Sequence, residues 1–445
     1  MLSNPKIVFK DYNPKQNFLF PPNLSELIEN DHPVRTISEV VDGLDISNLI
    51  RHHKPGGTSV YHPKMLLKVL IYGYLCNIYS SRKLEQALKE NVHFMWLSAM
   101  NRPDHNTLNR FSSERLKGEL KDIFAQIVLY LENEGLVSLQ TVFTDGTKIE
   151  ANANRYTFVW GKSIRKNKER IETQLEELWN YTQEVAKEEM KDTSEIVFKS
   201  MDKEKIKSII TTIDTTLKKK KIPSKIRQKI NYAKKNWPDN LEKYEKQQQI
   251  LGQRNSYSKT DPDASFMRMK EDHMRNGQLK AAYNLQLSTA NQFIINYTLH
   301  PNPGDTKTLL PHIENFECLY NKCPREIVTD AGYGSEENYL FLQKRKIKAY
   351  IKYNYFDKDQ KSKAITYSPS NPTLSKLRHK VHQLLNTKRG IKLRKQRCHD
   401  VEPVFAQIKH NKGFKRFFLR GHNKVEIETG LMAIAHNLRK LALAV

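Results

Sequence analysis

The sequence predicts a multidomain protein of mixed α+β and α/β character. Three observations lead to this expectation: helical periodicity in the first third, a charged helical segment in the middle, and apolar runs of strand length that alternate with helical segments after residue 261. The 445 residues are enough for about three domains. We therefore expect a helical N-terminal module (1–135), the first part of a sheet core (136–163), a helical insertion (164–260) and the remainder of the core with a C-terminal helix (261–445).

The N-terminal module is expected to be a series of short helices. Residues 1–60 are largely irregular and punctuated by proline, whereas residues 65–79 are apolar on nearly all sides and predict a core helix. Further helices are predicted at 25–29, 34–49, 82–90, 91–100, 105–117 and 119–134. Several short helices in series, the last but one of which carries Arg110, resemble a helix-turn-helix array that binds DNA. An ordinary helical bundle has the same periodicity, and the pattern alone does not separate the two.

The middle of the chain changes from a sheet pattern to a highly charged one. Residues 136–153 predict a strand, a tight turn at Asp145–Gly146 and a returning strand. The insertion (164–260) is rich in Lys, Glu and Gln at helical spacing, includes the run Lys218–Lys221, and suggests a helical hairpin. Its basic face could bind phosphate, or the whole insertion could be a solvated coiled-coil spacer. The sequence favours neither interpretation.

The last part of the chain alternates between strands and helices. Two strands are joined by a tight turn at Asn291, and a third apolar strand ends in a loop flanked by glycine. The stretch 354–390 is polar and is not assigned to an element. The predicted strands are 282–290, 292–300, 325–334 and 347–353, and the predicted helices are 306–320, 336–345 and 424–445. Within 394–414, a further helix is predicted to begin near His399.

Charge is the most informative property of the composition. The chain has 74 Lys and Arg against 49 Asp and Glu, a formal net charge of +25, and its isoelectric point is about 9.6. Such an excess favours a nucleic acid as partner, because bound phosphates exchange their counterions for Lys and Arg. The alternative is a basic protein in which lysine is simply frequent.

Other global features exclude several classes of protein. The mean hydropathy is −0.68, and no run approaches the roughly 18 apolar residues of a membrane helix, so no membrane partner is expected. The first residues lack the apolar segment of a secretory signal. Four cysteines in so long a chain do not form a disulfide framework, and the C-x4-C pair Cys318 and Cys323 lacks a second pair of zinc ligands. We expect a protein of the reducing cytoplasm.

Three acidic residues are the candidates for catalysis. Asp145 and Asp330 each follow a short apolar run that predicts a buried strand, and each is close to a glycine. Carboxylates at strand ends, where ligands bind in α/β sheets, suit a hard cation such as Mg²⁺. Glu402 lies on a predicted helix whose apolar neighbours Val401 and Val404 would turn it toward the sheet. Two such aspartates and a glutamate can form a two-metal site with the ions about 3.5–4 Å apart, although each acid alone is more often a turn former or a solvated charge.

Four blocks of sequence resemble the DDE transposases of bacterial insertion sequences. They are TDGTKIEANANRYTFVWGK (144–162), TDPDASFMRMK (260–270), IVTDAGYGSEENY (327–339) and VEPVFAQIKHNKGFKRFFLRG (401–421). DHNTLNRF (104–111) and the helices before it resemble the N-terminal module of that family. The blocks occur in the expected order, so the resemblance covers nearly the whole chain.

The resemblance implies a ribonuclease H-like core in which Asp145, Asp330 and Glu402 bind two Mg²⁺ or Mn²⁺ ions. It implies cleavage and strand transfer on double-stranded DNA with terminal inverted repeats and on target DNA, by a homodimer associated with the bacterial nucleoid. Many relatives carry a Tyr-Arg-Glu-Lys signature on the last catalytic helix. Lys409 fits the second half of that signature, whereas Arg397 lies five residues before Glu402 and fits the first half only loosely.

Other basic and aromatic residues are candidates for DNA contact. Arg155 and Trp160 follow the first acidic strand, and Trp160 could stack on a displaced base, or it could belong to the core. Lys148 could contact phosphate, and Lys409 could do so as a mobile point charge or be an ordinary surface lysine. The resemblance implies that Arg397 contacts the DNA substrate. Two alternatives to a transposase remain: a DNA-binding protein derived from one without catalysis, and a plain nuclease of the same fold.

Overall fold

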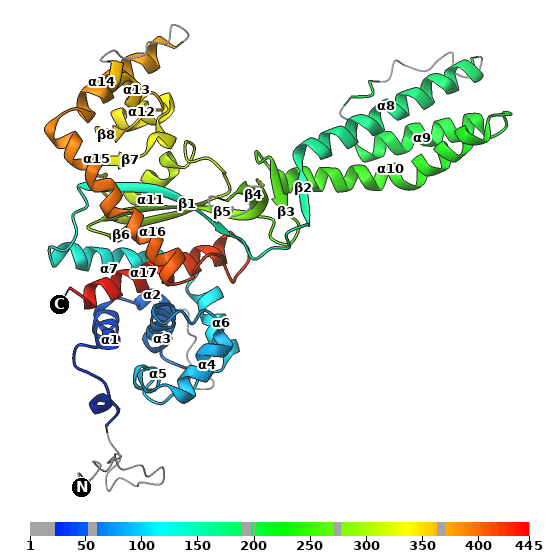
Figure 1. Ribbon diagram of the computed structural model, residues 1–445. Helices are drawn as coiled ribbons and strands as arrows, with labels where there is room; N and C mark the ends of the chain where they lie inside the picture. Colours follow the sequence, from blue (N-terminus) through cyan, green and yellow to red (C-terminus); the bar gives the residue numbers. More distant parts are fainter. Residues whose placement is uncertain are drawn as a thin grey trace, which may run out of the picture. The chain divides into compact units, whose positions relative to one another are not determined.

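The computed structural model describes residues 23–51, 60–187, 197–199, 201–269, 277–362 and 371–444 (Figure 1). The chain forms two compact units. One extends to Glu119 and includes the residues from Ile434 onward, and the other runs from Leu120 to Ala433. The predicted irregular start before residue 23 lies outside the described residues. Among the described helices, none combines the length and the apolar character needed to cross a membrane.

The first unit contains the short helices that the periodicity predicts. They are α1 (Pro33–Gly43), α2 (Ser47–Arg51), α3 (Pro63–Leu75), α4 (Ser81–Glu90), α5 (Val92–Leu97) and α6 (His105–Arg110), with a 3-10 turn (Leu24–Leu27) and a π-helical turn (Phe111–Arg115). Helix α3 is buried along most of its length and begins at Pro63, whose fixed φ suits the first turn. Asp104 caps α6 by accepting a hydrogen bond from the amide of Thr107.

The second unit is built on a six-stranded mixed sheet (Figure 1). Its strands are β1 (Thr141–Glu150), β4 (Ser265–Arg268), β5 (Leu279–Ala290), β6 (Phe293–His300), β7 (Glu326–Thr329) and β8 (Lys348–Ile351). The order is β4–β5–β1–β7–β8, with β6 on the same edge of β5 as β4. All pairs that involve β5 are antiparallel, whereas β1–β7 and β7–β8 are parallel. The α+β character with a mixed sheet is therefore confirmed.

Helices cover both faces of this sheet. They are α7 (Leu120–Asn133), α11 (Leu309–Tyr320), α12 (Glu336–Lys344), α13 (Phe356–Ser362), α14 (Pro372–Leu385), α15 (Lys388–Asp400), α16 (Glu402–Ala406) and the first part of α17 (His422–Ala442). His312 of α11 contacts Ser288 of β5, while Phe124 of α7 packs on Tyr297, the partner in register of Leu287. Because successive strand residues point to opposite faces, α11 and α7 lie on opposite faces of the sheet.

The insertion folds as three helices rather than as the suggested hairpin. They are α8 (Gly161–Val185), α9 (Lys203–Leu217) and α10 (Ser224–Leu251), which follow β2 (Phe158–Trp160) and precede β3 (Ser256–Ser258). Strands β2 and β3 pair antiparallel, so the insertion leaves and returns through a two-stranded ribbon. Leu175, Trp179, Ile213 and Trp237 belong to a hydrophobic core shared by the three helices. With only two helices, part of the apolar surface formed by these residues would stay exposed to solvent, and the third helix covers it.

Two predictions about local structure are wrong. The tight turn at Asp145–Gly146 does not form, because β1 continues to Glu150 and pairs with β5 from Phe143 onward. The helix predicted to begin near His399 does not begin there: α15 starts at Lys388 and ends at Asp400, α16 follows, and a π-helical turn spans Gln407–Asn411. The polar stretch 354–390, in its described part, contains α13 and α14.

Candidate active site

Asp145 and Asp330 lie close together because of the register between β1 and β7. The parallel pairing joins Phe143 to Val328, and the two aspartates each stand two residues further along. Asp330 follows the last residue of β7 and caps the next turn by accepting a hydrogen bond from the amide of Gly332 at 2.9 Å. Since paired strands are about 4.8 Å apart, the sheet brings the two carboxylates into one neighbourhood. Asp145 itself is in mid-strand and not at the predicted strand end.

Arg397 of α15 links Asp145 to Glu402. Its Nη1 lies 3.2 Å from Oδ2 of Asp145, and its Nη2 lies 3.5 Å from Oε1 of Glu402. The other oxygen of Asp145 accepts a hydrogen bond from the amide of Gly146 at 2.7 Å. The side chains of Asp145 and Arg397 are only 13% and 19% exposed. Two of the three predicted acids therefore share one largely buried guanidinium.

The expectation that Glu402 is buried against the sheet is wrong. Its side chain is 54% exposed, although Val401 and Val404 beside it are buried. Helix α15 ends at Asp400 and a new helix begins at Glu402, directly before Pro403. Proline has no backbone N–H to bond to the preceding turn, so the helix restarts at this point. Glu402 thus lies in the first turn of α16. Its Oε1 contacts Arg397, and more than half of its side chain is exposed to solvent.

Asp400 fixes the C-terminal end of α15 on the sheet. Its carboxylate is buried and accepts three hydrogen bonds, from Oγ1 of Thr289 at 2.7 Å and from the amides of Asn291 and Gln292 at 3.0 and 3.1 Å. The two amides belong to the β5–β6 turn, where both residues have positive φ. The turn predicted at Asn291 is therefore confirmed, and it presents its N–H groups to the helix. Asp400 stands two residues before Glu402, so this contact positions the candidate catalytic glutamate.

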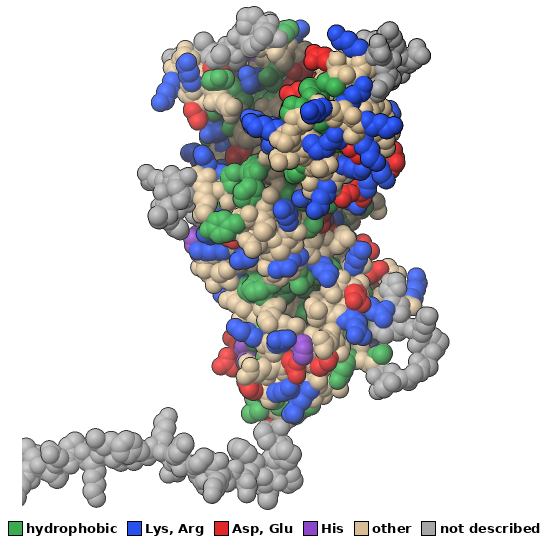
Figure 2. Space-filling view, turned by 90° about the vertical axis from the view of Figure 1, so that its right-hand side faces the viewer, with side chains coloured by type: hydrophobic (Ala, Val, Ile, Leu, Met, Phe, Trp, Pro, Cys, Tyr) green, Lys and Arg blue, Asp and Glu red, His purple; other side chains and the backbone are tan. Residues whose placement is uncertain are grey.

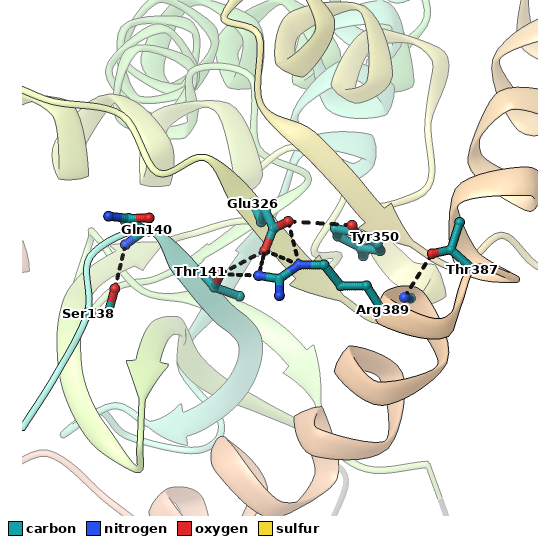
Figure 3. A network of polar contacts seen from close by, with 8 residues as sticks. Ser138, Gln140, Thr141, Glu326, Tyr350, Thr387 and Arg389 are labelled. Atoms are coloured by element: carbon teal, nitrogen blue, oxygen red, sulfur yellow. Dashed lines mark hydrogen bonds and ion pairs between the residues drawn. The ribbon is translucent and has the colours of Figure 1, made fainter.

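A second contact fixes the other end of α15 (Figure 3). The guanidinium of Arg389 pairs with the buried carboxylate of Glu326, with Nε 2.8 and 3.0 Å from its two oxygens and Nη2 in contact as well. Thr141, the partner of Glu326 in the β1–β7 register, donates a hydrogen bond to the same carboxylate at 2.8 Å. Arg389 lowers the pKa of Glu326. The helix that carries Arg397 is thus held at both ends by contacts to the sheet.

Asp305 is a fourth carboxylate in this neighbourhood, and the sequence did not single it out. Its Oδ1 accepts hydrogen bonds from the side-chain amides of Asn284 and Gln286 at 2.7 and 3.0 Å. A Cβ placed on Gly146 would lie 2.6 Å from that oxygen, and one placed on Gly332 would lie 3.7 Å from Oδ2 of Asp305 and 3.1 Å from Oδ1 of Asp330. The two glycines therefore let Asp305 approach β1 and the loop after β7. The only signal was a Gly-Asp pair before a helix, which is also an ordinary loop pattern.

The donor chemistry of the site fits divalent cations of the Mg²⁺ type. All the candidate ligands are carboxylates, and Mg²⁺ usually binds one or two carboxylates together with waters and substrate phosphates. Within the described ranges, no three His, Cys, Asp or Glu side chains gather closely enough to hold one ion. The site instead offers two pairs that share Asp145, one with Asp330 through the strand register and one with Glu402 through Arg397.

The predicted DNA-contacting residues lie in different environments. The side chain of Lys409 is buried. A surface lysine, or a lysine that contacts phosphate as a mobile point charge, would be exposed. Lys148 donates a hydrogen bond to the carbonyl of Arg268 at 2.9 Å. Arg155 is exposed. Trp160 is half-buried, with its ring centroid 6.1 Å from that of Phe266.

Arg110 belongs to the first unit and is exposed at the end of α6. Together with Thr107, Phe111 and Arg115 it lines a cleft of about 280 Å³. Two arginines at the rim of one cleft form a basic surface that a phosphate could contact.

Two segments of the chain match known protein families. Residues 22–114 match a family described as a transposase domain (DUF772), and residues 356–442 match a family described as a transposase DDE domain. Together the two matches support a DDE transposase of an insertion element. A transposase acts on DNA, which agrees with the net charge of +25 and with the lysine and arginine side chains spread over the face shown in Figure 2.

The matches cover only part of the chain. The DDE match contains Arg397, Glu402 and Lys409, and the other match contains Arg110. Asp145 and Asp330 lie between the two matched segments. No curated protein and no solved structure matches the chain.

Proposed function

We propose that this transposase cleaves DNA at the ends of an insertion sequence and transfers the freed ends to target DNA, in a reaction that depends on divalent metal ions. The arrangement that carries the proposal has Asp145 at its centre. Asp145 and Asp330 each stand two residues beyond the Phe143–Val328 pair of β1 and β7, and Arg397 joins Asp145 to Glu402. The DDE match over the segment with Glu402 supports it. The mixed sheet, with β1 at its centre and helices on both faces, supports a ribonuclease H-like core.

Asp145, Asp330 and Glu402 are the proposed metal ligands, and each has a distinct setting in the fold. Asp145 is held by β1 and by the Gly146 amide, and Asp330 is held as the cap of the turn after β7. Glu402 is the most exposed of the three, which leaves room for a DNA strand beside it. Two Mg²⁺ or Mn²⁺ ions held there would activate the attacking oxygen and stabilise charge on the transferring phosphate.

The proposed chemistry consists of two in-line phosphoryl transfers. In the first, a water molecule loses a proton and its oxygen bonds to the phosphorus at the element's end, the bond from phosphorus to the 3′-oxygen breaks, and that oxygen takes up a proton. In the second, the new 3′-hydroxyl loses its proton and its oxygen bonds to a phosphorus of target DNA, while the bond from that phosphorus to its own 3′-oxygen breaks and the leaving oxygen takes up a proton. Both transfers use one site, so the same carboxylates serve cleavage and joining.

The proposed DNA partner is a duplex that carries terminal inverted repeats, bound by a homodimer that holds both ends. The N-terminal helices with Arg110 would contact the repeats, and Arg155, Trp160 and Lys148 would contact DNA near the catalytic core. The exposed Arg155 supports such a contact directly. Lys409 would have to act from a buried position, close to the carboxylates rather than on the DNA surface.

The test is a strand-transfer assay with an oligonucleotide duplex taken from the boundary of the element, in the presence of Mg²⁺. Wild type should give cleaved and joined products, whereas Asp330→Asn should give neither while its affinity for the duplex is unchanged or higher, since a negative charge is removed. Asp357→Asn is the matched control, because Asp357 is 76% exposed and pairs only loosely with Lys352 at 3.4 Å. Cleavage by Asp330→Asn at the wild-type rate would refute the proposed ligand set.

The same assay separates the two alternatives. A DNA-binding protein without catalysis would retain the duplex but yield no product with any divalent ion. A plain nuclease would cleave the duplex and never join it to target DNA. Joined product is therefore the outcome that only the proposed transposition chemistry predicts.

A further inference from the structure

We propose that Arg397 is an exchangeable cation of the carboxylate site. Its guanidinium neutralises Asp145 and Glu402 until a divalent ion binds between them, and it then turns to a DNA phosphate. This inference rests on the proposed function, because it takes the two carboxylates to be metal ligands. It adds that metal binding and DNA binding are coupled through one side chain.

The position of the guanidinium supports the exchange. It contacts Oδ2 of Asp145 and Oε1 of Glu402, residues from different parts of the chain that a bridging ion would also have to join. The remaining Asp145 oxygen already accepts the Gly146 amide at 2.7 Å. A divalent ion held by the two acids would bring positive charge to the oxygens that the guanidinium contacts, and the two cations would repel each other. Metal and guanidinium therefore compete for the same pair of oxygens.

The contacts of Arg397 are those of a pair that can open. They measure 3.2 and 3.5 Å, longer than the roughly 2.7–2.9 Å of strong charge-assisted hydrogen bonds, and Glu402 is 54% exposed. Arg389, two turns earlier on α15, gives the contrast. It holds Glu326 with Nε at 2.8 and 3.0 Å, and that carboxylate is buried. One helix thus carries a tight structural ion pair and a loose one, and the loose one lies at the acids.

The consequence is reciprocal coupling between metal and DNA. If metal entry releases Arg397 for a phosphate, divalent ions must tighten DNA binding, and DNA must tighten metal binding by the same factor. A guanidinium suits the task, since it keeps its charge at any working pH and can bind either carboxylate or phosphate through two N–H groups. Removing the guanidinium should abolish the coupling and free the carboxylates for metal.

The first experiment measures Mn²⁺ affinity by electron paramagnetic resonance, using the full-length wild type, Arg397→Gln and Arg397→Lys. We expect Arg397→Gln to bind Mn²⁺ about tenfold more tightly, within the roughly 5- to 150-fold range of typical couplings, and Arg397→Lys to stay near wild type. Arg345→Gln is the control, because the Arg345 guanidinium pairs with Glu314 and Glu317 of α11, and this variant should leave Mn²⁺ affinity unchanged. Unchanged or weaker Mn²⁺ binding by Arg397→Gln would overturn the inference.

The second experiment measures the affinity for a 30-base-pair duplex of arbitrary sequence by fluorescence anisotropy, with Ca²⁺ or with chelator. Ca²⁺ should tighten binding in wild type, and this gain should vanish in Arg397→Gln. An equal gain in both proteins would contradict the coupling.

A third measurement needs no substitution and covers the case in which a variant does not fold. In wild type, labelling by phenylglyoxal is followed by mass spectrometry with and without Mn²⁺. Labelling of Arg397 should rise several-fold on addition of Mn²⁺, while Arg389 serves as the internal reference. Constant labelling of Arg397 would overturn the inference. If Asp145→Asn binds Mn²⁺ as wild type does, it is the proposed function that fails; if Asp145→Asn loses Mn²⁺ while Arg397→Gln gains nothing, only the exchange fails.

Discussion

Replacing Asp400 with alanine should destabilise the second unit by about 3 kcal/mol. The carboxylate is 3% exposed and accepts hydrogen bonds from Thr289, Asn291 and Gln292. A hydrogen bond to a charged group contributes roughly 1.5–3 kcal/mol, so three bonds set an upper limit near 9 kcal/mol. The amides of the β5–β6 turn lie near the surface and can bond to water instead, which leaves the buried Thr289 hydroxyl as the main loss. We therefore expect about 3 kcal/mol, a large fraction of the roughly 5–15 kcal/mol typical of a folded domain.

The effect should appear in both stability and activity. Urea unfolding followed by circular dichroism measures the first, and hydrogen exchange of the β5–β6 turn, read by mass spectrometry, locates it. Activity should fall as well, because Glu402 stands two residues beyond the lost anchor. Asp400→Asn keeps the size of the side chain but places an NH₂ group where a carboxylate oxygen accepts a hydrogen bond. It should lower the free energy of unfolding by about 1–2 kcal/mol. Asp357→Ala, at an exposed position, should change stability by less than about 0.5 kcal/mol.

A loss below about 1 kcal/mol for Asp400→Ala, with unchanged exchange in the turn, would refute this reasoning. It would mean that α15 is held on the sheet by its apolar contacts and by Arg389 alone. The role of Asp400 in positioning Glu402 would then have no support.

Three further outcomes follow from the structure. Gly146→Ala should lower the free energy of unfolding by about 1–3 kcal/mol in urea, because the added methyl group would lie 2.6 Å from Oδ1 of Asp305 and would clash with the Gln286 amide. An unchanged urea midpoint would mean that the side chains of Asp305 and Gln286 can move aside without loss of stability. Replacing Lys218–Lys221 with Gln should flatten the dependence of log DNA affinity on log salt, by about 0.9 per phosphate contact, if the insertion holds DNA. An unchanged slope would decide for the solvated spacer. Burial raises the pKa of Glu428 to about 7, so the folded state binds the proton of this carboxyl group more tightly than the unfolded chain does. The free energy of unfolding should therefore fall as pH rises from about 5 to 7 and level off above pH 7. Glu428→Gln should remove up to about 1.4 kcal/mol per pH unit of that slope in unfolding curves, whereas an unaltered slope would assign it to another group.

Elements with strong local signals were predictable from the sequence. The apolar run of α3, the capping residue Asp104 and the β5–β6 turn at Asn291 each specify their own structure within a few residues. The charged insertion was predicted as helical for the same reason. Its number of helices was not, because that depends on which apolar stripes find one another in the shared core.

The environment of the carboxylates was less accessible to sequence reasoning. Asp145–Gly146 has the form of a turn signal, yet β5 offers a long pairing partner, and the ladder from Phe143 to Glu150 overrides the local preference. Glu402 was expected to follow the burial of its apolar neighbours, but Pro403 restarts the helix and changes which face it occupies. Asp305 carries no signal beyond an ordinary loop pattern, since its neighbours at the site come from other strands.

The geometry of the site therefore depends on residues that carry no chemistry. The β1–β7 register sets the relation of Asp145 to Asp330, and the same register places Thr141 beside Glu326, where Arg389 attaches α15. Asp400 attaches the other end of that helix to the β5–β6 turn. A helix fixed at two points on one sheet has little freedom to move its side chains relative to β1. The distance from Arg397 to Asp145 thus depends on two contacts that a search for catalytic motifs does not detect. Losing either contact should alter the site even though all three candidate acids are still present.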